Sequence, residues 1–133
     1  LRIGYGVAQP ELADVLNRVR QPFNVNSFAL AGAVAALQDS EHLQHSVRVN
    51  REGMQQLETG LQALQLAYIP SVGNFISVDV GRDPAAVYEA LLREGVIVRP
   101  VDNYGMPGHL RISIGLAEEN RRCLDALGKV LAA

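Results

Sequence analysis

The chain has 133 residues, of which 48% are hydrophobic and 20% charged, and its formal net charge is −2, which is typical of one globular domain with a real core. The slightly acidic balance gives no general attraction to nucleic acid, the longest apolar stretch is too short to span a membrane, and the single cysteine, Cys123, cannot form an internal disulfide. We therefore expect a cytoplasmic protein with neither a nucleic-acid nor a membrane partner.

The first part of the chain is predicted to hold a strand and two helices. Residues 2–8 have the pattern of a strand, and Pro10 opens a short helix. The apolar residues of that helix are expected to face inward: Leu12, Val15, Leu16 and Val19. A break at residues 21–27, rich in asparagine, leads to a second helix at residues 28–38. This helix is apolar nearly all round, which is typical of a helix covered by protein on most sides, so the isolated chain is expected to self-associate or to be less stable.

The remaining residues predict an α+β fold. Residues 40–65 predict a long linking helix with its apolar residues on one face. Four short extended segments are expected at residues 68–70, 74–80, 96–99 and 110–114. Two further helices are expected at residues 84–93 and 117–131. This order predicts a small antiparallel-rich sheet with helices packed on one face, preceded by the long linking helix.

Three arginines lie inside apolar segments that are predicted to be strands: Arg2, Arg99 and Arg111. A guanidinium in such a place needs a partner, and its planar fork of donors fits carboxylates and phosphates. Alternation along residues 110–114 places Arg111 on the face of its strand opposite to the apolar residues, which also suits an arginine on the wet face of a one-sided sheet. Because Arg99 ends a neighbouring strand, the two side chains together predict one anion pocket.

Other candidate residues give weaker signals. The loop at residues 104–108 links the two arginine strands and could form the rim of their pocket, although a plain connection is its default interpretation. Asn74 follows a turn and could present an amide to a ligand, and no role is assigned to Tyr104. The histidines are not spaced as metal ligands, and Cys123 is predicted to pack inside the last helix.

Five motifs resemble the carboxy-terminal part of the pyridoxal-phosphate-dependent aminotransferases of fold type I, and within them the histidinol-phosphate aminotransferases. The motifs are LRIGYG at residues 1–6, RQPFNVN at 20–26, GNF at 73–75, GVIVRP at 95–100 and LRISIG at 110–115. They follow the order of the family over residues 1–131. The resemblance implies that residues 1–26 are the tail end of a large cofactor-binding domain and that residues 27–133 are linking helices and a carboxy-terminal small domain.

The resemblance also implies separate roles for the three arginines. Arg2 matches the residue that grips the phosphate of pyridoxal 5'-phosphate. Arg111 matches the residue that receives the acidic group of the substrate, and Arg99 resembles a second arginine that helps select the phosphate-bearing amino substrate or the far carboxylate of glutamate. Asn24 and Asn26 match a segment near the mouth of the active site in relatives, and their roles stay open.

The lysine that forms the Schiff base in this family would lie upstream of Leu1, so the chain is expected to be a piece of a longer protein and to be inactive by itself. Lys129, the only lysine in the sequence, is predicted to lie in the last helix and cannot replace it. The resemblance implies that the parent is a homodimeric enzyme of histidine biosynthesis. Its substrates would be histidinol phosphate, or imidazole acetol phosphate in reverse, and glutamate or 2-oxoglutarate.

Two alternatives remain open. Aromatic amino acid aminotransferases and threonine-phosphate decarboxylases share much of the same framework, and only a substrate test separates them. A different class of protein, a non-enzymatic anion-binding or interaction module, would use Arg99 and Arg111 to hold an anion without chemistry.

Overall fold

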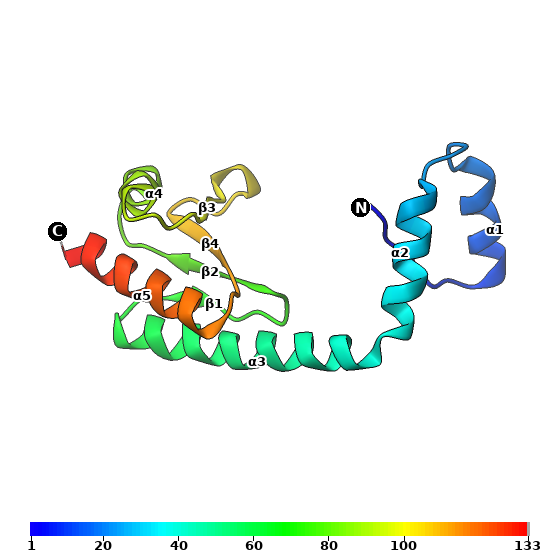
Figure 1. Ribbon diagram of the computed structural model, residues 1–133. Helices are drawn as coiled ribbons and strands as arrows, with labels where there is room; N and C mark the ends of the chain where they lie inside the picture. Colours follow the sequence, from blue (N-terminus) through cyan, green and yellow to red (C-terminus); the bar gives the residue numbers. More distant parts are fainter. Residues whose placement is uncertain (133) are drawn as a thin grey trace. The chain divides into compact units, whose positions relative to one another are not determined.

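The computed structural model describes residues 1–132 and divides into two compact units, Leu1–Gln44 and His45–Ala133. Figure 1 colours the elements along the chain. The α-helices are α1 (Pro10–Val19), α2 (Ser27–Gln38), α3 (Ser40–Ala63), α4 (Pro84–Arg93) and α5 (Ala117–Ala132). The strands are β1 (Tyr68–Ile69), β2 (Phe75–Asp79), β3 (Arg99–Pro100) and β4 (His109–Ser113), and a 3-10 helix, η1, covers Asp102–Tyr104. These elements confirm the expected α+β class.

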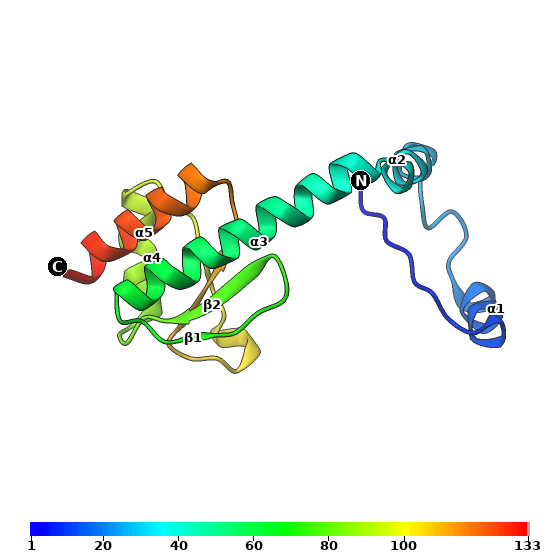
Figure 2. The same cartoon turned by 90° about the horizontal axis from the view of Figure 1, so that it is seen from below.

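The amino-terminal unit lacks the strand that the sequence predicts at residues 2–8. Residues 1–9 have no regular secondary structure, and Figure 2 shows them leading into α1 without a neighbouring strand. A strand needs a partner for its backbone N–H and C=O groups, and residues 1–44 contain no strand that could supply one. The apolar content of this segment is therefore not sufficient to form a strand here.

Helix α1 begins at Pro10, as expected, but it buries none of its residues. The apolar residues expected to face inward are all exposed, from 53% for Leu12, Val15 and Leu16 to 73% for Val19. The prediction of inward packing is therefore wrong within this unit. The helical spacing of these residues does create one apolar stripe, but no other element of this unit covers it.

Helix α2 is capped by Asn26, whose side-chain oxygen accepts a hydrogen bond of 2.8 Å from the backbone N–H of Ala29. Ala29 is the only buried residue among those of α2. Phe28 is 84% exposed, Val34 56% and Leu37 65%. This confirms that the apolar helix lacks cover in the chain, and it leaves a contiguous apolar surface of the kind that marks an interface.

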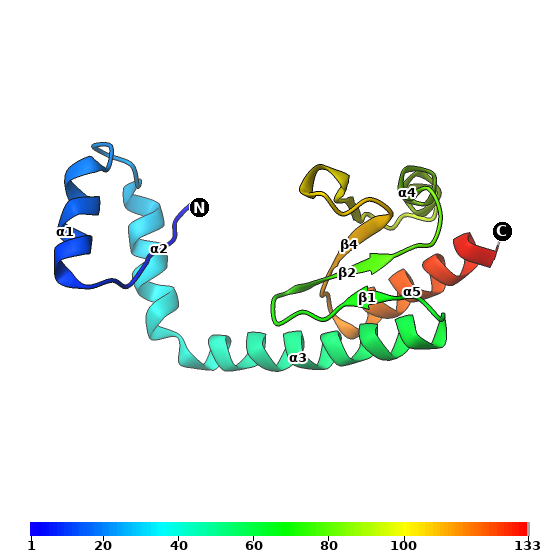
Figure 3. The same cartoon turned by 180° about the vertical axis from the view of Figure 1, so that it is seen from behind.

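The carboxy-terminal unit contains a four-stranded antiparallel sheet in the order β1-β2-β4-β3. Helix α5 lies in front of the strands in Figure 1 and behind them in Figure 3. The core joins one face of the sheet to helices α3, α4 and α5, as the sequence predicts. Its fully buried side chains include Leu57, Leu61, Ile76, Val78, Leu91, Leu110 and Leu127. Burial of each such side chain contributes about 1.5–3 kcal/mol.

Strand β3 is shorter and later than the extended segment expected at residues 96–99. Val96 and Val98 are buried in the core, while Ile97 is 83% exposed. The apolar alternation of residues 96–98 therefore comes from a connecting segment that packs on the core, and these residues do not pair with a neighbouring strand. The ladder itself begins at Arg99 and includes Pro100. Proline is tolerated there because β3 is an edge strand and needs no donor on its outer side.

Cys123 packs in the core at 8% exposure, as predicted, and desolvation by burial raises the pKa of its thiol to about 11.

We expect Ellman's reagent to label Cys123 slowly at pH 8 in the native chain and rapidly in denaturant, because the thiolate is the reacting form. Between pH 9 and pH 11 the unfolded state loses the thiol proton while the folded state keeps it. The free energy of unfolding should therefore fall as the pH rises through this range. Cys123→Ala should lack this component of the pH dependence, and rapid native labelling would contradict the assignment.

The exposed apolar surface of α2 predicts self-association of the isolated 133-residue chain. Static light scattering over a range of concentrations should give an apparent mass that rises with concentration. Phe28→Ser should reduce this rise because it removes the exposed aromatic ring of α2. Val72→Ser removes an exposed apolar side chain in a turn of the other unit. It serves as the control and should leave the concentration dependence of the mass unchanged. A constant monomer mass for the unmodified chain would refute the prediction.

Candidate functional site

The sheet brings Arg99 and Arg111 directly opposite each other. They are Cα partners in the antiparallel pairing of β3 with β4. Leu110 and Ile112, which alternate with Arg111, are buried against the helices, so both arginines lie on the face of the sheet opposite to α3, α4 and α5. Like charges directly opposite each other destabilise a strand pair. An anion between the two guanidinium groups would relieve this repulsion.

Neither Arg99 nor Arg111 forms an ion pair or a hydrogen bond with a carboxylate anywhere in residues 1–132. Arg99 is exposed and Arg111 is partly buried. Their planar N–H forks therefore remain available for a carboxylate or a phosphate. The two arginines of the predicted anion pocket thus lie on paired strands, and the pocket itself stays a prediction.

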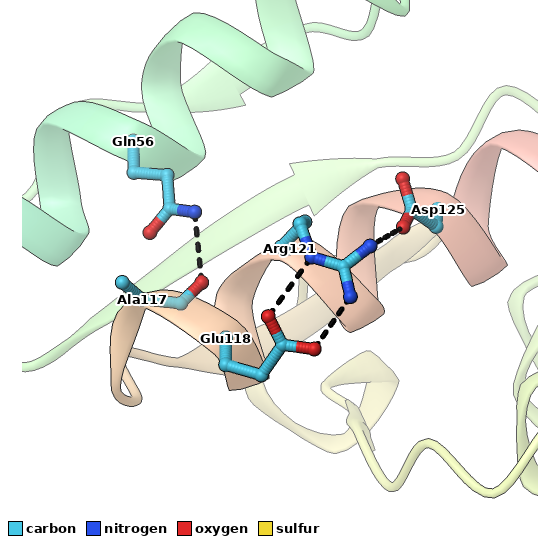
Figure 4. A network of polar contacts seen from close by, with 5 residues as sticks. All are labelled: Gln56, Ala117, Glu118, Arg121 and Asp125. Carbon is cyan, nitrogen blue, oxygen red and sulfur yellow. Dashed lines mark hydrogen bonds and ion pairs between the residues drawn. The ribbon is translucent and has the colours of Figure 1, made fainter.

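Arg121 shows the contrasting, structural use of an arginine. It donates to both carboxylate oxygens of Glu118 and to Asp125 at 2.8 Å, all on α5 (Figure 4). The hydrogen bond from Arg121, followed by its charge, lowers the pKa of Glu118. Beside this network Gln56 of α3 donates to the backbone oxygen of Ala117 at 2.9 Å. Each of the three guanidinium nitrogens of Arg121 already donates to a carboxylate, so Arg121 is a poor candidate ligand for an external anion.

Phe75 is a neighbour of Arg111 that the sequence reasoning missed. The guanidinium carbon of Arg111 lies 5.0 Å from the centroid of the Phe75 ring, within the range of a cation–π interaction. Phe75 pairs with Ser113, and Arg111 pairs with Ser77, so the two side chains are diagonal neighbours on the same face. The signal that could have found this contact is the alternation along β2, where Ile76 faces the core and Phe75 the opposite side.

The segment after β4 is fixed by Asn120, a polar side chain of α5 that is 2% exposed. Its side chain accepts a hydrogen bond of 2.9 Å from the N–H of Gly115, and it donates to the oxygen of Gly115 at 3.0 Å and to Gln56 at 3.2 Å. Gly53 of α3 packs so closely that a Cβ there would lie 2.5 Å from a methyl carbon of Ile114. These contacts tie the strand that carries Arg111 to two helices.

The connection from β3 to β4 is the compact loop that the sequence predicts. It contains η1, and Gly105 and Gly108 have positive φ angles of 74° and 83°, which other residues adopt only with strain. Tyr104 is 58% exposed. The loop joins the ends of the two arginine strands, and within residues 1–132 the side-chain hydroxyl of Tyr104 has no hydrogen-bond partner.

The asparagines singled out by the sequence lie in three different settings. Asn26 caps α2, as described above, and Asn24 accepts a hydrogen bond of 3.3 Å from Arg20. The backbone oxygen of Asn74 accepts a hydrogen bond of 2.9 Å from Ile114, and Asn74 lines a surface pocket of about 660 Å³ together with His45. The structure therefore gives Asn26 a structural role.

Arg2 and Lys129 lie outside the arginine pair. Arg2 belongs to the amino-terminal unit, is exposed, has a φ angle of 62°, and has no ion-pair partner within residues 1–132. Lys129, the only lysine of the sequence, donates to Glu94 at 2.7 Å from α5. That Lys129 has no role in the chemistry stays a prediction.

Two other kinds of site are not found in the described part of the chain. No group of three histidine, cysteine or acidic side chains in residues 1–132 could hold a metal ion. None of the helices described there combines the length and the apolar content that a membrane span requires.

The carboxy-terminal unit is an α+β module whose small sheet packs helices α3, α4 and α5 on one face and carries two opposed arginines on the other. The profile of the family described as aminotransferase class I and II matches residues 1–127, so the chain belongs to that family. Two relatives named histidinol-phosphate aminotransferase 2, from Pseudomonas fluorescens strain Pf-5 and from Pseudomonas aeruginosa, are each 66% identical to it over 132 residues, which is 99% of this chain. The chain spans only 36% of the length of these relatives.

A solved structure gives the same picture. The crystal structure of histidinol-phosphate aminotransferase from Sinorhizobium meliloti in complex with pyridoxal-5'-phosphate superposes with a TM-score of 0.76 at 27% identity. The match covers 92% of this chain and 34% of that one. The resemblance expected from the five sequence motifs is therefore confirmed at the level of the family and the fold.

The hydrogen bonds of Asn120 predict a measurable contribution to stability. Asn120→Ala leaves the part-buried N–H and C=O of Gly115 without their side-chain partner, which should lower the free energy of unfolding by about 1–3 kcal/mol. Urea denaturation followed by circular dichroism measures this change. Asn103→Ala, at an exposed position of η1, is the matched control and should leave the midpoint unchanged. Equal midpoints for both variants would show that the Asn120 contacts do not stabilise the fold.

Proposed function

We propose that the chain is the carboxy-terminal part of a histidinol-phosphate aminotransferase, which transfers an amino group between glutamate and imidazole acetol phosphate in histidine biosynthesis. The observation that carries the proposal is the direct register of Arg99 and Arg111 on the face of the sheet opposite to α3, α4 and α5. The relatives that are 66% identical carry this name, which supports the choice of substrate. In this proposal residues 1–26 end the large cofactor-binding domain, and residues 27–133 form the linking helices and the small domain.

The two arginines would bind the acidic groups of both substrates. Arg111 would hold the acidic group, and Arg99 would help to select the phosphate of histidinol phosphate or the far carboxylate of glutamate. A guanidinium fork fits either anion through paired N–H···O bonds, so one site can serve both halves of the reaction. Each such charge-assisted contact contributes about 1.5–3 kcal/mol. These residues would orient the substrate and would not carry out proton transfer.

Arg2 would hold the phosphate of pyridoxal 5'-phosphate. Its guanidinium suits this ligand because it is exposed and has no carboxylate partner in residues 1–132. When bound, the cofactor supplies an electron sink for negative charge at the α carbon of the substrate. The lysine that moves the proton would come from a part of the enzyme outside this chain, which spans 36% of its relatives' length, because Lys129, the only lysine here, lies on the last helix, α5. The chain by itself would therefore be inactive.

The exposed apolar residues of α1 and α2 would pack against the rest of the full-length enzyme. Phe28 and Val19 are 84% and 73% exposed, which is costly for a surface that stays in water. The full-length enzyme would be a homodimer in the cytoplasm. A single buried, free cysteine suits that reducing compartment.

Substitution of the arginine pair in the full-length protein tests the proposal. Arg111→Ala should lower kcat/KM for histidinol phosphate and for 2-oxoglutarate by about 10- to 150-fold, the equivalent of 1.5–3 kcal/mol, because a charge-assisted contact is lost. Arg99→Ala should have an effect of the same kind. Arg93→Ala removes an exposed arginine of α4 that has no ion pair within residues 1–132, and it should leave both constants unchanged. Steady-state transamination assays measure all of these constants.

The outcomes separate the alternatives. If Arg111→Ala leaves both specificity constants unchanged, the assigned role is wrong. If aromatic amino acids or threonine phosphate outcompete histidinol phosphate in the unmodified protein, another activity on the same fold is the correct one. Saturable phosphate binding with no turnover of any amino donor would favour the non-enzymatic anion-binding module.

A further inference from the structure

We propose that Phe75 is a positioning residue that aims Arg111 at the substrate. This inference rests on the proposed function, since the anion that Arg111 would hold is the acidic group of that substrate. The ring attracts the guanidinium to one place on the sheet and so fixes the direction in which its N–H groups point. Phe75 would act through Arg111 and not by touching the reacting atoms.

The geometry of the contact leaves every donor of Arg111 available. The guanidinium carbon lies 5.0 Å from the ring centroid, and the attraction acts through the flat face of the ring. The five N–H donors of a guanidinium lie in its own plane, so an aromatic partner fixes the group without consuming them. A carboxylate partner would occupy the same donors, as Glu118 and Asp125 do for Arg121.

The position of the ring also separates the two cations. Arg99 lies on β3 and Phe75 on β2, which are on opposite sides of β4 in the sheet. The residue of β2 directly opposite Arg111 is Ser77, whose small side chain leaves room for Arg111 to lean across β2 toward the ring. The ring therefore attracts the guanidinium of Arg111 toward the side of β4 away from Arg99. In this proposal, the attraction would leave room for one anion between the two guanidinium groups.

The turn that precedes β2 lies beside the Phe75 ring. The ring is close to Gly73, since a Cβ added to Gly73 would lie 3.6 Å from Cε1 of Phe75. The oxygen of Gly73 accepts a hydrogen bond of 3.1 Å from Asn50 of α3, and its N–H donates to Ser71 at 3.1 Å. The backbone beside the ring is thus tied to a helix of the core. Such support is what a side chain needs in order to fix another.

Binding of succinate, an unreactive dicarboxylate, to the full-length protein loaded with pyridoxal phosphate tests the inference by isothermal titration calorimetry. Phe75→Leu keeps an apolar side chain but removes the aromatic face, and it should weaken succinate binding about fivefold. Phe75→Met is a second variant without a ring, for use if the leucine variant does not fold. Phe75→Tyr keeps the ring and should bind within about twofold of the unmodified protein. In transamination assays the leucine variant should raise KM for 2-oxoglutarate more than it lowers kcat.

A double-variant cycle distinguishes positioning from packing. In an Arg111→Ala background, Phe75→Leu should cause no further loss of succinate affinity, because Phe75 acts only through Arg111. An equal loss in both backgrounds, or unchanged affinity of Phe75→Leu in the unmodified background, would overturn the inference. If the unmodified protein shows no transamination but its affinity for succinate depends on Phe75, the proposed function is rejected, while the positioning of Arg111 by Phe75 toward a bound anion is retained.

Discussion

The strand register that places Arg99 of β3 opposite Arg111 of β4 is the constraint on which the candidate site depends. Two cations held opposite each other, with no carboxylate partner in residues 1–132, form an arrangement whose repulsion must be balanced by something else. The fold supports it through the buried face of the same strands, because the core positions of β2 and β4 hold the ladder together against the helices. The apolar packing on one face of the sheet thus offsets the repulsion between Arg99 and Arg111 on the other face.

The chain uses its basic side chains in two ways. Arg18, Arg121 and Lys129 pair with acidic side chains on the surface, where each exposed pair contributes little to stability. Arg111 is held by an aromatic ring, which costs it no hydrogen-bond donor. The second kind of support is the one expected where an arginine must keep its planar fork free for a ligand.

The two units differ in how far they can bury their own apolar residues. The unit from His45 onward has a core built from one sheet face and three helices, and most of its large aliphatic side chains contribute to it. The unit before it buries Ala29 but leaves Phe28 and the apolar stripe of α1 exposed. An apolar helix with so much exposed surface suits a segment that packs against other protein, which agrees with a chain spanning about a third of its relatives' length.

Most of the helices and the class of the fold followed from the sequence alone, because hydrophobic periodicity is a local property of the chain. Residues 84–93 were predicted with the bounds that α4 has, and the alternation around Arg111 indicated the correct face. The strand expected at residues 2–8 failed because strand formation depends on a partner and not on composition. The register that sets Arg99 opposite Arg111, and the diagonal contact of Phe75 with Arg111, were decided only by the tertiary structure. Both join residues far apart in the chain, and no spacing within a single segment specifies which residues of two strands will meet.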